Sequence, residues 1–187
     1  MNASWEEEPD AGLVERALLG EERAFAEIVR RNKQRLFRVI NRSVLNQEDA
    51  LELLQETFVS AHGALRRYDP QRPLQAWLMT IALNKARDWR RREAVRRILR
   101  AALPIGAAAD IADGAALSDV TVSDRQELYI VEKRIAELPA RLQEVIVLRT
   151  LEGMSQAETA AILQISEKAV ETRLYRARRK LLEDDTA

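Results

Sequence analysis

Residues 154–174 read MSQAETAAILQISEKAVETRL, which is the most specific pattern in the chain. Ser155 and Glu158 are spaced as a capping box, in which each side chain serves a free backbone amide at the start of a helix. The pattern then predicts a short helix, a two-residue turn and a second helix capped by Ser166. This order is typical of a helix-turn-helix, which directs its second helix into the major groove of DNA.

The second helix of this motif combines an apolar face with a polar one. Ala169, Val170 and Leu174 recur at helical spacing on the inner face. An ordinary helical hairpin with a solvated basic face is the competing interpretation. Gln164 stands where a turn glycine is common, and a left-handed backbone there would cost about 1–2 kcal/mol. The candidate DNA contacts are Ser166, Glu167, Lys168, Glu171, Thr172, Arg173 and Arg176.

Long stretches without glycine or proline indicate an all-α protein. Residues 21–62, 74–103 and 154–187 contain neither residue and are rich in good helix formers. Residues 101–124 hold four aspartates, no base and no lasting helical period, which predicts a flexible acidic linker. We therefore expect two helical domains, residues 11–100 and 125–183, on either side of it.

Composition excludes several kinds of function. The 187 residues contain 30 bases and 30 acids, no cysteine and one histidine, His62. These counts exclude a disulfide scaffold, a thiolate metal site, a cysteine nucleophile and a histidine-rich metal site, so we expect no cofactor and no metal. The sequence has no phosphate-binding glycine loop either, which argues against an enzyme. With no apolar run long enough for a membrane span and no secretory signal at the start, we expect a cytoplasmic protein.

Residues 46–65 predict an amphipathic helix with an acidic stripe. Glu48, Glu52 and Glu56 follow one another at four-residue spacing. Such pairs of like charge weaken an isolated helix by a few tenths of a kcal/mol, so helix stability does not explain them. A solvated face is one explanation, and a docking surface for a basic partner is the other.

A basic helix follows from residue 74. Tyr68 and Trp77 offer planar surfaces on which unstacked bases could lie. Tryptophans such as Trp77 and Trp89, taken alone, are more often core residues than platforms for bases. Phosphates require cationic donors. The helix supplies such donors, with one amide, at Asn84, Lys85, Arg87, Arg90, Arg91 and Arg92.

The two halves together resemble the bacterial extracytoplasmic-function (ECF, group IV) sigma factors, which keep only the second and fourth conserved sigma regions. The resemblance covers about residues 13–97 and 128–182. The matching segments are DALELLQETF (49–58), RPLQAWLMTIALN (72–84), LPARLQEVIVLR (138–149), EGMSQAETA (152–160) and ETRLYRARRKL (171–181).

The resemblance implies a role for each segment. For the first domain, the resemblance implies two kinds of contact. One is docking on the β′ clamp helices of core RNA polymerase, and the other is reading and melting of the −10 promoter element. The docking residues would be Asp49, Glu52, Leu53, Gln55, Glu56 and Phe58. The −10 residues would be Arg66, Arg67, Tyr68, Trp77, Asn84, Lys85, Arg87, Arg90 and Arg91.

For the second domain the resemblance implies a helix over 138–149 that meets the polymerase β flap, and a recognition helix over 166–178, Arg178 included, that reads the −35 element. The acidic linker would occupy the polymerase cleft. An anti-sigma factor is the further partner implied. Because the net charge is zero, we expect weak promoter binding without core enzyme.

One alternative stays open at this point, a free-standing helix-turn-helix regulator that does not act through polymerase. The acidic stripe and the helix around Trp77 and Asn84 favour the sigma interpretation, since a ligand sensor needs neither. An anti-sigma or adaptor protein would not need two basic helices.

Overall fold

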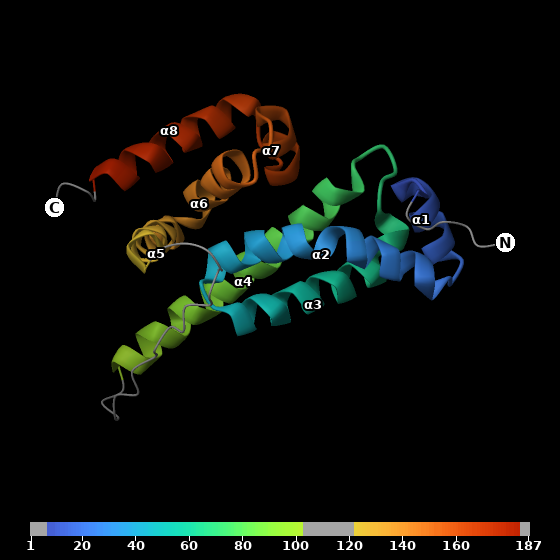
Figure 1. The fold of residues 1–187 in the computed structure, drawn as a ribbon, viewed down its shortest axis with the longest axis horizontal. Helices are drawn as coiled ribbons and strands as arrows, with labels where there is room; N and C mark the ends of the chain where they lie inside the picture. The colour runs from blue at the N-terminus through green and yellow to red at the C-terminus, as the bar shows by residue number, and fades with distance from the viewer. Residues whose placement is uncertain (1–6, 103–121, 184–187) are drawn as a thin grey trace.

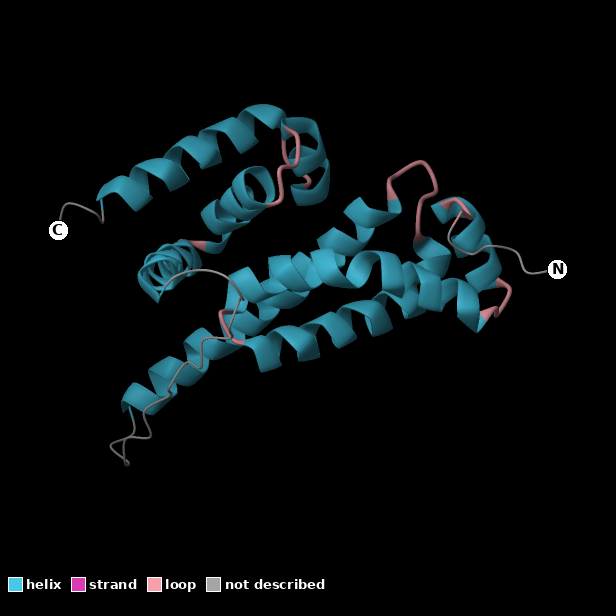
Figure 2. Ribbon diagram, viewed as in Figure 1, coloured by secondary structure: helices cyan, strands magenta, loops and turns pink. Residues whose placement is uncertain are grey.

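The protein is described from a computed structural model, which covers residues 7–102 and 122–183. Within these two ranges every regular element is a helix and no strand occurs (Figure 2). The all-α class predicted from the sequence is therefore confirmed. Most of the predicted linker, residues 103–121, lies outside the described ranges.

The elements fall into two groups, here called the first module and the second module. The first module consists of α1 (Asp10–Leu18), α2 (Glu22–Val44), α3 (Gln47–Ala64), the 3₁₀ turn η1 (Leu65–Arg67) and α4 (Leu74–Ala102). The second module consists of α5 (Val122–Glu137), α6 (Ala140–Ile146), the π-helical turn η2 (Val147–Leu151), α7 (Gln156–Leu163) and α8 (Glu167–Glu183).

Three long helices, α2, α3 and α4, pack against one another to form the first module (Figure 1). Their buried faces share a core of aliphatic side chains. The Asn46 side chain accepts a hydrogen bond from the Asp49 amide at 3.0 Å, which fixes the start of α3 as an N-cap does. Fully buried members of this core include Leu36, Ile40, Leu53, Leu78 and Met79.

The carboxylate of Glu27 is a buried charge of the first module. Arg30 and Arg31, one turn further along α2, hydrogen-bond it at 2.6–2.8 Å. These bonds lower the pKa of Glu27 from 4.5 to about 2. Arg31 also pairs with Asp10 at 3.1 Å, so the same cluster holds α1 against α2.

Acid is therefore expected to weaken the first module through Glu27. A carboxyl whose pKa is lowered by folding stabilises the fold in full above pH 4.5, and this contribution is lost as the pH falls toward 2. The melting temperature of a Glu27→Gln variant should fall less than that of the parent between neutral and acidic buffer. Thermal unfolding over this pH range checks it, with exposed Glu22→Gln as the control. Parallel pH profiles for the parent and Glu27→Gln would contradict it.

The second module contains the helix-turn-helix that the sequence predicts. Ser155 and Glu158 form the complete capping box, with the Ser155 Oγ accepting from the Glu158 amide at 3.1 Å and the Glu158 carboxylate accepting from the Ser155 amide at 2.7 Å. Ser166 caps α8 by accepting from the Ala169 amide at 3.2 Å. Both helix starts predicted from the sequence are thus confirmed.

Gln164 keeps the left-handed turn geometry that is usually given to glycine. Its backbone lies at φ 54° and ψ 47°, and the following amide, of Ile165, bonds to the Ala160 carbonyl at 3.1 Å. The turn is therefore not altered. A side chain at this position strains the backbone instead.

A Gln164→Gly variant is expected to unfold with a free energy about 1 kcal/mol higher than the parent, because glycine adopts this conformation without a Cβ penalty. Gln164→Ala is the matched control, since alanine keeps the Cβ and should leave stability nearly unchanged. Urea unfolding of the three proteins measures the difference. A glycine variant no more stable than the alanine variant would show that the turn is unstrained.

The second module packs on α2 and α4 of the first. Helix α7 contacts α4, and both α5 and η2 contact α2. In Figure 1, α6–α8 lie above α2, and α3 lies below it. The two modules thus share one interface in the described part of the chain, and this interface sets which basic side chains are accessible.

Candidate nucleic-acid and polymerase interfaces

Helix α8 presents most of the predicted recognition residues to solvent. Val170 and Ala177 are buried on its inner face, as the periodicity predicts. Arg173 is half-buried. The other candidates are all exposed, namely Ser166, Glu167, Lys168, Glu171, Thr172, Arg176 and Arg178.

Two of the exposed side chains on α8 have local partners. Lys168 pairs with Glu171 at 2.8 Å, with both side chains more than half exposed. The Thr172 hydroxyl donates to the Lys168 carbonyl at 2.8 Å. An exposed ion pair of this kind contributes little to stability, so Lys168 can exchange Glu171 for a nucleic-acid partner at small cost.

Helix α4 directs its predicted donors to three different sides. Lys85 pairs with Glu56 of α3 at 3.2 Å. Asn84 and Arg91 are exposed. Arg87 turns toward the second module and donates to the Asn84 side chain at 2.9 Å. Lys85 and Arg87 therefore each have a carboxylate partner within the chain, and their contacts to DNA stay a prediction.

Tyr68, in the loop before α4, packs against Trp77 in the first turn of α4. The Tyr68 and Trp77 rings lie 5.2 Å apart and tilted by 53°. The Tyr68 hydroxyl donates to the Arg72 carbonyl at 2.5 Å, and partial burial raises its pKa. Arg66 and Arg67 in η1 are exposed beside this pair. The rings are half-buried, so each keeps part of its surface accessible.

Helix α3 carries the acidic stripe, but two predicted docking residues do not lie on it. Leu53 and Phe58 are only 2% and 8% exposed because they belong to the core shared with α2 and α4. They cannot contact a partner in this conformation, which corrects the sequence-based assignment. Leu51 and Val59, which the sequence analysis missed, are 47% and 73% exposed. The accessible stripe therefore combines Glu48, Glu52 and Gln55 with two apolar side chains.

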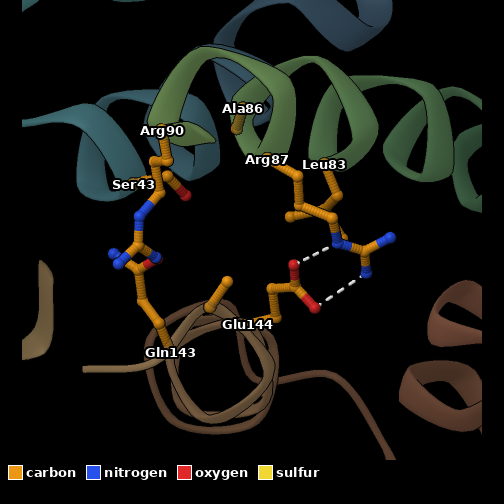
Figure 3. Close-up of a pocket in the computed structure, with 8 residues that line it drawn as sticks. Ser43, Leu83, Ala86, Arg87, Arg90, Gln143 and Glu144 are labelled. Carbon is orange, nitrogen blue, oxygen red and sulfur yellow. Dashed lines mark hydrogen bonds and ion pairs between the residues drawn. The ribbon is translucent and has the colours of Figure 1, made fainter. Parts of the chain in front are cut away.

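The interface between the modules holds Arg87 and Arg90 of α4. Arg87 forms a two-pronged ion pair with Glu144 of α6, one of whose bonds measures 2.7 Å (Figure 3). Arg90 donates to the Gln143 side chain and to the Leu138 carbonyl, the latter at 2.8 Å. Glu144 raises the pKa of Arg87 and burial lowers that of Arg90, yet arginine remains cationic at neutral pH in either case.

A second ionic contact joins α2 to the loop after η2. Arg35, Arg38 and Arg42, here called the α2 row, all pair with Glu152, whose side chain is only 2% exposed. The shortest contact is 2.6 Å, between Arg42 Nη1 and Glu152 Oε1. The Glu152 amide bonds to the Val147 carbonyl five residues back, so the π-helical turn positions this carboxylate.

An open cleft of about 640 Å³ lies beside this interface. Its lining includes five arginines and one carboxylate: Arg87, Arg90, Arg91, Arg141, Arg173 and Glu144. Positive charge is thus in excess where the two modules meet.

The α2 row, Glu144 and Glu152 were not predicted from the sequence as members of a contact. The spacing of three and four residues between the three arginines was the available signal, since it puts them on one helix face. Nothing local indicates that a carboxylate more than a hundred residues away neutralises them.

Comparison with known proteins agrees with this architecture. Residues 28–100 match the family model "Sigma-70 region 2" and residues 128–181 match "Sigma-70, region 4". RNA polymerase sigma factor CnrH of Cupriavidus metallidurans is 39% identical over 178 residues, covering 94% of this chain and 93% of the relative. The ECF RNA polymerase sigma-E factor of Escherichia coli K12 is 31% identical over 90% of each chain.

Solved structures give the same result. CnrH in complex with the cytosolic domain of CnrY aligns with a TM-score of 0.67 at 35% identity, covering 94% of this chain and 97% of that one. A Bartonella quintana RpoE, solved with the anti-sigma factor NepR, shares the fold with a TM-score of 0.64, covering 85% of this chain and 94% of that one. The chain belongs to the ECF family of RNA polymerase sigma factors. No helix within the described residues is long and apolar enough to cross a membrane.

Proposed function

We propose that this chain binds core RNA polymerase in the cytoplasm and directs initiation at promoters whose −10 and −35 elements it reads with the first and second modules. The chain performs no reaction of its own in this proposal, because polymerase makes the RNA. The stripe on α3 docks on the polymerase, α4 and its preceding loop read and melt the −10 element, and α8 reads the −35 element.

One observation carries the proposal: an acidic, partly apolar face on α3 stands in the same chain as a helix-turn-helix whose second helix exposes lysine and arginine. Glu48 and Glu52 with Leu51 and Val59 form a surface of the mixed kind that protein partners use. Lys168, Arg176 and Arg178 are exposed on α8, where a major groove would meet them. A regulator acting without polymerase has no use for the first of these surfaces.

Control by an anti-sigma factor belongs to the same proposal. Its support is that CnrH and the Bartonella RpoE, both of this fold, were solved in complex with CnrY and NepR. Among the described residues, the exposed α3 stripe and α8 are the surfaces that such a partner would have to cover in order to block function.

Run-off transcription with purified bacterial core polymerase tests the proposal. The templates are promoters upstream of the protein's own operon, and the reactions are run with and without this chain. Initiation that depends on the chain supports the sigma function. Absence of initiation, together with no co-elution with core in gel filtration, would overturn it in favour of a free-standing regulator.

A further inference from the structure

Arginines from three different helices converge on the cleft of about 640 Å³ described above. Helix α4 contributes three of them, α6 contributes one and α8 contributes one, namely Arg87, Arg90, Arg91, Arg141 and Arg173. Among the described residues that line the cleft, Glu144 alone carries a carboxylate. Because converging like charges repel one another, a lining of five cations and one anion attracts further negative charge into the cleft.

The one carboxylate of the lining is already fully engaged. Arg87 holds Glu144 through both carboxylate oxygens, and the Glu144 side chain is only 4% exposed. Arg90 bonds only neutral acceptors, which are the Gln143 side chain and two backbone carbonyls at 2.8 and 3.0 Å. The charge of Arg90 is therefore not neutralised by any group that it touches.

The other three arginines of the lining have weaker partners or none. In the described part of the chain neither Arg141 nor Arg173 forms a hydrogen bond or an ion pair, and Arg141 is exposed. Arg91 has one long ion pair with Asp88, at 3.9 Å, in which both side chains are exposed. Such a pair contributes little, so three guanidinium groups on three helices remain available to a ligand in one cleft.

The size and the remaining wall of the cleft indicate a small ligand rather than a DNA duplex. A volume of about 640 Å³ lies inside the range of about 300–1,000 Å³ that is usual for small-molecule sites. Leu163 and Ile165, at the end of α7 and in the turn that follows, give the cleft an apolar wall. Arginine forks match phosphate oxygens in pairs, and linked phosphates can engage guanidinium groups from several helices at once.

We propose that this cleft binds a small ligand that carries two or more linked phosphates. Arg91, Arg141 and Arg173 bind the phosphates, and Arg90 adds its unneutralised charge from the wall of the cleft. An inorganic polyphosphate supplies this chemistry by itself. A nucleotide supplies it together with a base that packs on the apolar wall at Ile165.

The site overlaps with residues that have another proposed partner. Arg91 and Arg173 are among the residues proposed to contact promoter DNA, and this overlap alone rests on the proposed function. A ligand that occupies them competes with DNA for the same donors. Binding of the ligand is measured on the full chain without polymerase or promoter, so the two proposals fail separately.

Isothermal titration calorimetry of the full chain with sodium tripolyphosphate, in magnesium-free buffer of fixed ionic strength, tests the site. We expect one tripolyphosphate per chain. The variant Arg141→Gln with Arg173→Gln should bind it at least about tenfold more weakly, because two charge-assisted contacts are lost. Neither side chain has a partner in the described part of the chain, so the variant leaves no group unpaired, and circular dichroism checks that it is folded.

The matched control is Arg23→Gln with Lys33→Gln. It removes two positive charges at exposed positions on α2, outside the lining of the cleft, and should bind tripolyphosphate as the parent does. Equal weakening in the control and in the cleft variant would show a diffuse attraction to basic surface and would overturn the proposal. Absence of tripolyphosphate binding to the parent would overturn it as well.

Two further titrants identify the source of the phosphates. ATP that binds more tightly than tripolyphosphate, and does so only with Arg141 and Arg173 in place, would support a nucleotide as the ligand. Equal affinities for ATP and tripolyphosphate would support recognition of the phosphate chain alone. A thymidine oligonucleotide that binds through Arg141 and Arg173, in a chain that does not bind tripolyphosphate, would overturn the proposal and make the cleft a nucleic-acid surface.

Discussion

A chain carrying Glu48→Lys and Glu52→Lys should bind core RNA polymerase about a hundredfold more weakly than the parent, since placing like charges across an interface costs several kcal/mol. Both side chains are exposed on α3, on the face that also carries Val59. The two lysines repel each other along the helix as the two glutamates did, so the fold loses little beyond a favourable charge at the start of α3.

Fluorescence anisotropy of labelled chain titrated with core polymerase measures this affinity. Glu22→Lys with Glu137→Lys is the matched control, because it changes the net charge equally at exposed positions away from α3. The control should bind core as the parent does. Equal affinities for the stripe variant and the control would remove α3 from the polymerase interface.

Val59 makes the accessible face of α3 a mixture of charged and apolar side chains. Val59 is 73% exposed and Leu51 is 47% exposed, so two apolar side chains lie on the accessible face of α3. The apolar residues of 46–65, Leu53 and Phe58 among them, recur at steps of three and four, and this periodicity predicts that they lie on the inner face of the helix. Their assignment to the polymerase surface came from the family resemblance, and burial in the core corrects it.

Local sequence signals predicted the helical elements well because each has a local physical cause. The capping box at Ser155 and Glu158 is a contact between residues three apart, and it forms as predicted. The turn at Gln164 shows the limit of such signals. The sequence alone left open whether the turn changes its geometry or the backbone of Gln164 is strained. In the structure α7 packs against α8, and Gln164 keeps the left-handed backbone conformation.

The interface between the modules could not be predicted from the sequence, for a different reason. Arg42 and Glu152 are 110 residues apart, and Arg87 and Glu144 are 57 apart. No periodicity links such positions, and in a chain of zero net charge a row of arginines looks like any solvated face. The sequence therefore suggests DNA contacts for Arg87 and Arg90 but gives no sign that the second module also binds them.

Lys168→Ala and Arg178→Ala are expected to weaken −35 recognition in different ways, although both residues are exposed on α8. Lys168 lies in the first turn of the recognition helix, the part that approaches base edges, whereas Arg178 lies three turns further on, where a helix leaves the groove toward the backbone. Loss of a base contact costs about 1–3 kcal/mol at one base pair and alters preference there. Loss of a phosphate contact weakens every sequence alike and lowers the salt slope by about 1.

Initiation by holoenzyme on a set of promoters that differ singly across the −35 element separates the two outcomes. Lys168→Ala should reduce the differences in initiation rate among promoters that differ at one base pair of the −35 element. Arg178→Ala should lower the initiation rate on all of these promoters by a similar factor. Lys180→Ala, an exposed lysine further along the same helix, is the matched control and should leave the ranking intact. Because Lys168 gives up only a weak, exposed pair with Glu171, any altered ranking reports a lost base contact rather than a distorted helix. A uniform loss for Lys168→Ala on every promoter would instead place this lysine on the DNA backbone and move base reading to Arg173 and its neighbours.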